Sequence, residues 1–299
     1  MMSFDEFKKE VVLAMEQRIG EGNVHLQNCI KNNDTKKVGL LLKSSDSNVS
    51  PVIYLEDYYK ELKRKPFCQI LEDIWQTYQK HKTFVNLDTS MFMQWSAVRE
   101  KVVMKVINYN YNQELLKSVP YDRFLDLAVV YYYILDTKED HEATVLIHNH
   151  HMDLWEIDKD ELKSAAWHNY EKFYEISVQG LDEAIMEMVG MSLSEMEQRP
   201  RRMQPILYLV TNQRQINGAT AVLFPDKMKA LAEYLQTDLY ILPSSIHELL
   251  AFPKTVNMAE KLKEIVHDIN VTSVQRAEVL SDEVYLYSRD TGEIELAVA

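Results

Sequence analysis

Two hydroxyl groups lie close to a histidine and a glutamate in the stretch "LPSSIHE", residues 242–248. A serine nucleophile needs an imidazole to take its proton and a third group to orient that imidazole. Ser244, Ser245, His247 and Glu248 supply these residue types, and Ser245 and His247 would share one face of a strand. A hydrolase-like active site is therefore one hypothesis for this segment.

The residues around the serines favour a different interpretation, the turn of a β-hairpin. A nucleophile elbow needs glycines beside the serine so that the chain can turn sharply, and "LPSSIHE" contains no glycine. Proline and serine are typical turn residues, and serine hydroxyls often bond to the nearby backbone. We therefore interpret the segment as a turn and keep its four polar residues as candidates only.

A second group of chemically active side chains is the histidine cluster in "LIHNHHMDLWEID", residues 146–158. His148, His150 and His151 lie close to Asp153, and imidazoles beside a carboxylate can bind zinc. Their spacing matches no zinc signature, and we interpret the segment as the polar end of a strand before a helix. The glycine-rich loop that cradles phosphates is also missing from the sequence. The sequence therefore predicts no bound metal and no cofactor.

Asp126 is the least expected residue of the longest apolar run, "RFLDLAVVYYYILD", residues 123–136. The β-branched and aromatic content of this run predicts a central strand. A carboxylate within such a strand must find hydrogen-bond donors or reach water. We therefore expect Asp126 to fix the geometry of a polar site, and it is the fifth candidate catalytic residue.

Composition and charge exclude several classes of function. The 299 residues carry a formal charge of −13, which opposes sequence-independent nucleic-acid binding and favours either a solvated surface or a basic partner. The N-terminus has no signal-peptide pattern, and no apolar run approaches the roughly 20 residues of a membrane span. The two cysteines form no disulfide framework. These features predict a cytoplasmic protein that binds neither nucleic acid nor membrane.

The pattern of apolar residues predicts an α+β fold, in which antiparallel sheets are built from recurring hairpin–helix units with helices packed on a face. We expect two regions, residues 1–90 and residues 91–299. The first contains helices over 4–19 and 67–81 and a hairpin between them. In the second, a helix over 91–112 precedes three strand–turn–strand–helix units, whose hairpins lie near 124–149, 205–224 and 238–253.

The stretch 181–203 contains five methionines and is compatible with a helix. Methionine side chains repack easily, so the stretch fits an adaptable helix that binds a partner. It also fits a connecting helix packed on the core. The sequence leaves both interpretations open.

Four segments in order, "LDLAVVYYYIL", "ATVLIHN", "VTNQRQINGATAVLFP" and "LYILPSSIHELLAFP", resemble a family of unknown function from Gram-positive anaerobic bacteria. The resemblance extends over almost the whole chain. It implies an association with mobile genetic elements and an accessory or defence-related role, and no particular activity. Because the residues form no convincing catalytic arrangement and the chain carries a charge of −13, we expect a non-catalytic intracellular protein that binds another protein. The alternative is an enzyme with its site around Ser244, Ser245, His247 and Glu248.

Overall fold

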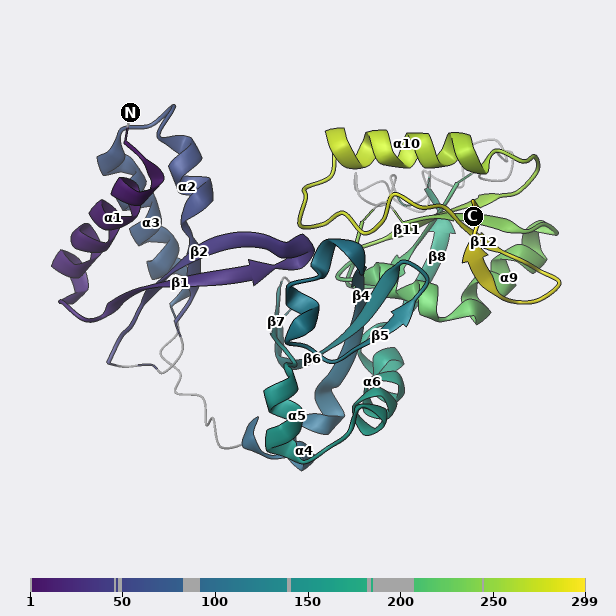
Figure 1. The fold of residues 1–299 in the computed structure, drawn as a ribbon, viewed down its shortest axis with the longest axis horizontal. Helices are drawn as coiled ribbons and strands as arrows, with labels where there is room; N and C mark the ends of the chain where they lie inside the picture. The colour runs from purple at the N-terminus through teal and green to yellow at the C-terminus, as the bar shows by residue number, and fades with distance from the viewer. Residues whose placement is uncertain are drawn as a thin grey trace, which may run out of the picture. The chain divides into compact units, whose positions relative to one another are not determined.

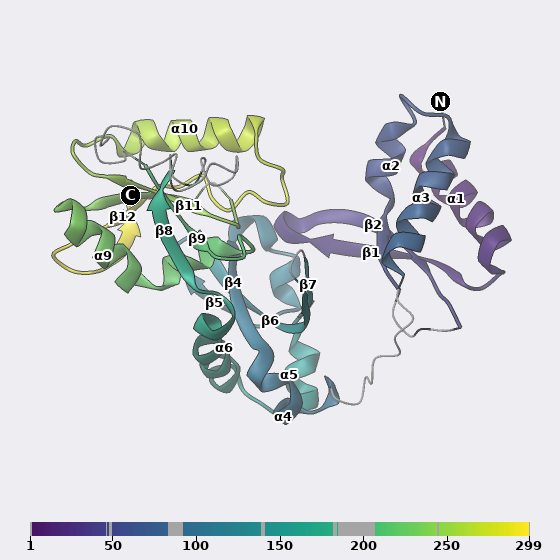
Figure 2. The same ribbon diagram turned by 180° about the vertical axis from the view of Figure 1, so that it is seen from behind.

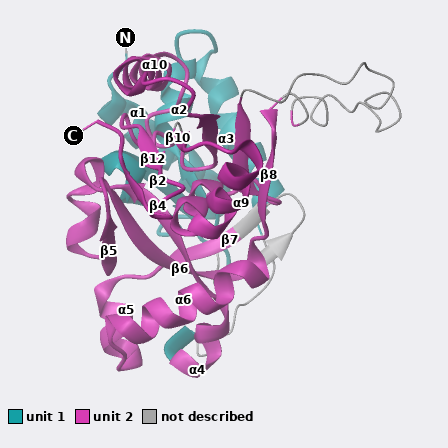
Figure 3. Ribbon diagram, turned by 90° about the vertical axis from the view of Figure 1, so that its right-hand side faces the viewer, with its two compact units in different colours: residues 1–93 teal, residues 94–299 magenta. Residues whose placement is uncertain are grey.

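The computed structural model describes residues 2–45, 47, 50–82, 92–138, 141–181, 184, 207–243 and 245–298. The chain divides into two units, residues 1–93 and residues 94–299, which are coloured separately in Figure 3. Each unit contains both helices and antiparallel strands. The predicted α+β fold is therefore confirmed.

Unit 1, residues 1–93, is a three-stranded antiparallel sheet with helices. Its elements are α1 (Phe4–Ile19), β1 (Val24–Lys31), β2 (Thr35–Leu42), β3 (Val52–Tyr54), α2 (Leu55–Glu61) and α3 (Phe67–His81). A capping box between Ser3 and Glu6 starts α1. The predicted helices 4–19 and 67–81 and the hairpin of β1 and β2 are confirmed.

The hairpin of unit 1 turns at Asn33 and Asp34, whose φ angles are 58° and 47°. Asn and Asp tolerate this left-handed region better than most residues, which explains why they mark the turn in the sequence. The core of the unit lies between the helices and the sheet, where Phe7 and Val11 of α1 belong to the same buried cluster as Ile70 of α3.

Unit 2, residues 94–299, contains two sheets and most of the helices. Its first elements are α4 (Trp95–Val98), β4 (Val102–Asn108), β5 (Tyr121–Phe124), β6 (Leu127–Lys138), β7 (His141–Leu146), α5 (Asn149–Trp155) and α6 (Lys159–Phe173). The elements that follow are β8 (Ile176–Gly180), β9 (Tyr208–Asn212), the 3-10 helix η6 (Gly218–Leu223), α9 (Pro225–Leu235), β10 (Leu239–Leu242), β11 (Leu249–Pro253), α10 (Ala259–Thr272), β12 (Tyr285–Tyr287) and β13 (Ile294–Leu296).

The strand β6 is the centre of a four-stranded sheet, because it pairs with β4, β5 and β7. Its residues from Leu127 to Ile134 are all buried. The prediction of a central strand in the run 123–136 is therefore confirmed. The antiparallel pair of β6 and β7 is also the first predicted hairpin, and α6 is the helix predicted to follow it. The segment between them, interpreted as the polar end of a strand, is instead the helix α5.

The second sheet of unit 2 has six antiparallel strands in the order β13-β12-β10-β11-β9-β8. Figure 1 shows α10 over one face of this sheet and α9 on the other side. Leu262 and Val266 of α10 pack in one buried cluster with Tyr240 and Leu242 of β10. The hairpin of β10 and β11, predicted near 238–253, and the helix after it are confirmed.

The helix predicted over 91–112 is wrong. Only Trp95–Val98 is α-helical, a 3-10 turn follows at Arg99–Lys101, and the strand β4 occupies Val102–Asn108. The valines of this segment fit a helical stripe, but β-branched side chains are stiff and favour strands. Pairing with β6 over seven residues decides the conformation.

The hairpin predicted near 205–224 is also wrong. β9 pairs with β8 and with β11, and the chain then enters η6 instead of returning as a strand. Asn217 takes the positive φ, 50°, that its turn signal indicates, but it starts a 3-10 helix. Among the residues that the structure describes after Arg123, strand–turn–strand–helix units therefore occur twice instead of the predicted three times.

Of the methionine-rich stretch 181–203, only Leu181 and Ala184 belong to the described residues, so both interpretations of it stay predictions. No helix in the described part of the chain is both long and apolar enough to span a bilayer.

Candidate binding pocket

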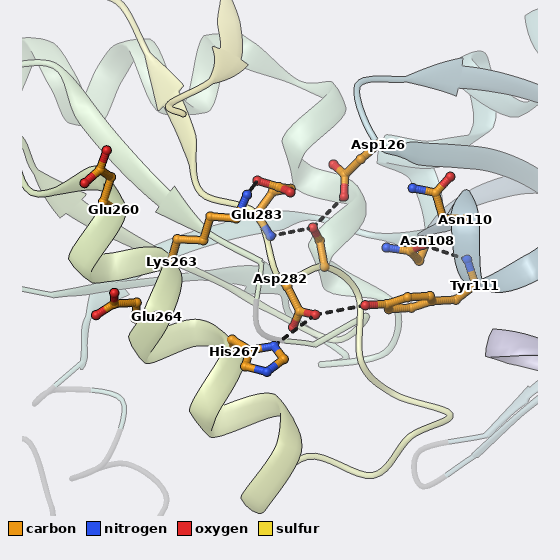
Figure 4. A pocket seen from close by; sticks show the side chains of 11 residues that line it. Asn108, Asn110, Tyr111, Asp126, Glu260, Lys263, Glu264, His267, Asp282 and Glu283 are labelled. Carbon is orange, nitrogen blue, oxygen red and sulfur yellow. Dashed lines mark hydrogen bonds and ion pairs between the residues drawn. The ribbon is translucent and has the colours of Figure 1, made fainter. Parts of the chain in front are cut away.

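A pocket of about 680 Å³ opens in unit 2 where three segments of the chain meet. These are the end of β4 with the turn after it, the turn between β5 and β6, and α10 with the loop 281–283. Figure 4 shows their side chains around one space. The lining residues are Asn108, Asn110, Tyr111, Asp126, Glu260, Lys263, Glu264, His267, Ser281, Asp282 and Glu283.

Asp126 reaches this pocket from a two-residue turn. Phe124 pairs with Leu127, so Leu125 and Asp126 connect β5 to β6, and Asp126 precedes the central strand instead of lying inside it. Leu125 has φ 53°, a left-handed conformation that costs a side chain such as leucine about 1–2 kcal/mol. Packing elsewhere must hold this strained turn, which aims the Asp126 carboxylate at the loop 281–283 (Figure 4).

The Asp126 carboxylate accepts two hydrogen bonds from hydroxyls that are fully buried. Ser281 Oγ donates to Oδ2 at 2.5 Å, and Tyr285 Oη donates to Oδ1 at 2.7 Å. Burial, together with the negative Asp126, raises the pKa of Tyr285 far above its usual value. The phenol of Tyr285 therefore stays protonated and donates. The hydrogen-bond donors that we expected for Asp126 are thus Tyr285 of β12 and Ser281 of the loop before it.

Asp282 is the second fixed carboxylate. It accepts hydrogen bonds from Asn270 Nδ2 at 2.8 Å and Tyr111 Oη at 2.9 Å, and its Oδ2 lies 3.3 Å from Nδ1 of His267. Partial burial favours a higher pKa for Asp282, but the hydrogen bonds from Asn270, Tyr111 and His267 outweigh it and lower the pKa. Asp282 is therefore ionised near neutral pH. Burial and the contact with Asp282 raise the pKa of Tyr111 to about 12.

One face of α10 forms the acidic wall of the pocket. Glu260, Lys263, Glu264 and His267 are spaced i, i+3, i+4 and i+7, which places them on the same side of the helix. Lys263 Nζ forms an ion pair with Glu283 Oε2 at 2.5 Å, so Glu283 already balances the positive charge of Lys263. Glu260 and Glu264 have no ion-pair partner among the described residues. Five carboxylates thus face one paired lysine and one histidine.

The loop that completes the pocket is tied to both neighbouring elements. Asn108, buried at the end of β4, donates to the carbonyl of Leu280 at 2.9 Å and accepts the amide N–H of Tyr111 at 2.8 Å. Asn270 of α10 donates to the carbonyl of Ser281 at 2.9 Å. These buried amide bonds hold the loop between β4 and α10, so the pocket exists before any ligand arrives.

Of the four candidate catalytic residues that the structure describes, only Asp126 lines this pocket. Ser244 lies outside the described residues. Ser245 Oγ accepts the backbone N–H of His247 at 3.1 Å, and the His247 ring accepts the N–H of Asn217 at 3.4 Å. Within the described part of the chain, no hydrogen bond joins the Ser245 hydroxyl to that ring, and Glu248 leads into β11. This geometry is that of a turn whose hydroxyl bonds to the backbone.

The three candidate metal-binding histidines gather at the start of α5. The ring centroids of His150 and His151 lie 4.1 Å apart, and those of His148 and His150 lie 5.5 Å apart. His151 Nδ1 accepts the backbone N–H of His148 at 3.0 Å, so one nitrogen of its ring is occupied. In the described ranges, no group of three or more His, Cys, Asp or Glu side chains has the arrangement of a metal site.

We expect chelation to leave the stability of the protein unchanged. Purified protein should contain no stoichiometric zinc, and its melting temperature should be the same with and without EDTA. A structural zinc ion stabilises a folded protein by about 10 kcal/mol or more. A fall of many degrees in the presence of EDTA would contradict our interpretation of His148, His150 and His151.

The histidine cluster should make the protein less stable in mild acid. Burial, and the proximity of His150 and His148, lower the pKa of His151 from 6.5 to about 4. Between these values the unfolded chain binds a proton that the folded chain excludes, so stability falls as the pH falls from 6.5 to 4. A pKa shift of this size corresponds to a change of roughly 3 kcal/mol in the free energy of unfolding when the group is fully buried. His151 is only half-buried, so we expect about 1–2 kcal/mol.

The substitution His151→Gln should remove most of this acid sensitivity, because glutamine can accept the same N–H without titrating. Urea unfolding at pH 7 and at pH 4.5 measures the effect. The matched control is His168→Gln, which replaces an exposed histidine of α6 in the same unit. An equal pH dependence in both variants would show that the cluster does not cause the loss.

Sequence reasoning missed most of the pocket. Lys263 and His267 belong to a predicted helix, but their polar stripe resembles an ordinary solvated face. Asp282 and Glu283 precede the last hairpin without any motif of their own. The spacing of Glu260, Lys263, Glu264 and His267 on one helix face was the available signal, and it becomes informative only when the opposite wall is known.

The fold and the pocket define an α+β protein with a preformed acidic pocket in its larger unit. The chain belongs to a family of unknown function (DUF5688), whose model matches residues 4–289. The resemblance to a family of unknown function over nearly the whole chain is thus confirmed. No curated protein and no solved structure matches the chain.

Proposed function

We propose that the protein is a non-catalytic binding protein, and that the pocket in unit 2 receives a basic group from a protein partner. The observation that supports this proposal most directly is the excess of carboxylates in a preformed pocket. Asp126 and Asp282 are held by hydrogen bonds, and Glu260 and Glu264 face solvent on α10. The net charge of −13 favours the same kind of partner over long distances.

The size of the pocket suits a side chain. A volume of about 680 Å³ lies within the roughly 300–1,000 Å³ of ordinary ligand sites, and it is large enough for an arginine or lysine and its neighbours. A guanidinium or ammonium group would find carboxylate acceptors on Asp282 and Glu264. Because the lining loop is already fixed, little ordering cost accompanies binding.

Charge reversal on α10 tests the proposal. The probe is a fluorescein-labelled tetra-arginine peptide, titrated into the full chain at 50 mM and 300 mM salt. Glu260→Lys/Glu264→Lys should weaken binding at least tenfold, and salt should weaken it further. The control Glu171→Lys/Glu233→Lys makes the same change of net charge at exposed positions of α6 and α9. Equal weakening in both double variants would refute a specific site.

A pull-down then connects the pocket to a partner. The wild-type chain should recover a protein with a basic segment from a lysate of its own organism at low salt, and the α10 double variant should not. Recovery of the same proteins by both forms would count against the proposal. The cytoplasmic location rests on the two cysteines, which are both free, and the accessory role on mobile elements rests on the family resemblance. Cell fractionation tests the location, and identification of the genes that flank the gene of this protein tests the accessory role.

An enzyme is the second candidate, and one contact favours it. The Asp282 carboxylate lies 3.3 Å from Nδ1 of His267, and it is itself fixed by Tyr111 and Asn270. A carboxylate that orients an imidazole in a pocket is the usual arrangement of a general base. Hydrolysis of a panel of nitrophenyl esters, phosphates and glycosides tests this candidate. Activity that His267→Gln abolishes and Glu171→Lys retains would replace the binding proposal.

A further inference from the structure

A second hollow of unit 2 lies between β8 and α9, away from the acidic pocket. It has a volume of about 440 Å³ and shares no lining residue with that pocket. β8 is the last strand of the six-stranded sheet, and in the described part of the chain it pairs only with β9. Figure 2 shows β8 at the edge of the sheet, and α9 supplies the opposite wall of the hollow.

The two walls are regular and run over similar lengths. Ile176, Val178 and Gly180 are alternate residues of β8, so they share one face of the strand. Across from them, α9 contributes the stripe Lys227, Ala230, Leu231 and Tyr234, spaced i, i+3, i+4 and i+7. The strand wall extends about 13 Å at roughly 3.3 Å per residue, and the helix wall about 10 Å at roughly 1.5 Å per residue.

The lining is mostly apolar and partly open to solvent. Tyr234 is 65% exposed, and Val178 and Ala230 are also not fully buried. The one charged lining residue is Lys227, which makes no ion pair with any described residue although the chain carries a charge of −13. A strand edge next to an apolar groove is the feature by which several protein families bind extended peptides.

We propose that this groove binds an extended apolar segment of a partner protein, which adds as a strand to the edge of β8 that pairs with no described strand. About four residues of the segment fit along the groove. Their backbone pairs with β8, and alternate side chains pack against Ala230, Leu231 and Tyr234 of α9. A carboxylate of the segment, either an acidic side chain or a free C-terminus, pairs with Lys227. The surface goes beyond the acidic pocket and is tested separately from it.

Selection from random peptides displayed with free C-termini on phage, with the full chain as the target, provides the probe. We expect enrichment of short segments with apolar residues at alternate positions and a carboxylate at one end. The best peptide is then synthesised with a fluorescent label and titrated. Ala230→Trp should fill the groove and Lys227→Glu should repel the carboxylate, and each should weaken binding at least tenfold.

Two substitutions on the outer side of the same helix are matched controls. Glu233→Trp adds the same ring, and Lys229→Glu makes the same charge change, at exposed positions that do not line the groove. Both should bind the peptide as the wild-type chain does. A peptide that binds Ala230→Trp and Glu233→Trp equally well, or no enrichment at all, would overturn the proposal.

N-methylation of the peptide backbone distinguishes strand addition from simple apolar contact. Successive amide N–H groups of an added strand point alternately toward β8 and away from it. N-methyl groups at one alternate set of positions should therefore abolish binding, and at the other set they should leave it unchanged. Equal effects at both sets would exclude strand addition. Dimerisation of the protein that Ala230→Trp prevents would assign the edge to a second copy and would also overturn the proposal.

Discussion

Gly218→Ala should destabilise unit 2 by about 3 kcal/mol or more. Gly218 opens η6, and a Cβ atom at this position would overlap the hydroxyl oxygen of Thr211 and the carbonyl oxygen of His247, and would lie 2.9 Å from Asn212 N. Two of these atoms belong to the backbone, and the third is fixed by the hydrogen bond from Thr211 Oγ1 to the His247 carbonyl at 2.8 Å. Such overpacking costs about 1–3 kcal/mol even where side chains can move, and here little can.

Urea unfolding of Gly218→Ala beside Gly292→Ala measures this effect. Gly292 lies in the same unit at φ 73°, where the nearest atom to an added Cβ is Tyr287 Oη at 4.0 Å. The control therefore reports the cost of a positive φ without crowding, about 1–2 kcal/mol. If the two variants lost the same stability, the close contact between η6, β9 and the segment before β11 would not exist as described.

The comparison of β4 with α1 explains which elements the sequence could predict. The apolar stripe of α1, from Phe7 through Val11, agrees with its capping box and its terminal glycine, so every local signal indicates a helix. In β4, Val102 and Val106 fit a helical stripe as well as a strand. The ladder that pairs Val102 with Tyr133 decides the outcome, and this contact joins residues 31 positions apart. Local periodicity could not decide it.

Asn217 and Gly218 show a second limit of structure prediction from the sequence. Asn-Gly is a strong hairpin signal, and Asn217 does adopt a left-handed conformation. The hairpin does not form because β9 already pairs with β8 on one side and β11 on the other, so a strand after Asn217 cannot pair with β9. The turn was predictable from two residues, whereas the path after it depends on the order of the whole sheet.

The pocket was predictable only in part, because its walls are distant in the chain. Asp126 was recognisable as a carboxylate that needs donors. Its donors, Ser281 and Tyr285, lie 155 and 159 positions further along the chain. No spacing rule connects such residues, since they meet only when β12 and β6 are both placed within unit 2. The turn "LPSSIHE" was predictable for the opposite reason, because the proline and serines that indicate it are adjacent in the chain.

Asp126→Ala should cost about 3–5 kcal/mol of stability, although the residue is only partly buried. The substitution leaves the buried hydroxyls of Ser281 and Tyr285 without their acceptor. Each buried unpaired donor costs about 1–3 kcal/mol. Tyr285→Phe removes one donor and should cost about 2 kcal/mol, because a hydrogen bond to a charged group is stronger than a neutral one.

The two substitutions together should cost less than the sum of their separate effects, by about 1–2 kcal/mol, because Asp126→Ala already breaks the bond that Tyr285→Phe removes. Urea unfolding of the four members of this cycle gives the coupling. Glu264→Ala is the matched control, since it removes an exposed carboxylate of the same pocket and should change stability by about 0.5 kcal/mol or less. Strict additivity would mean that the carboxylate and the phenol do not bond, and that the loop 281–283 is held against β6 by other contacts.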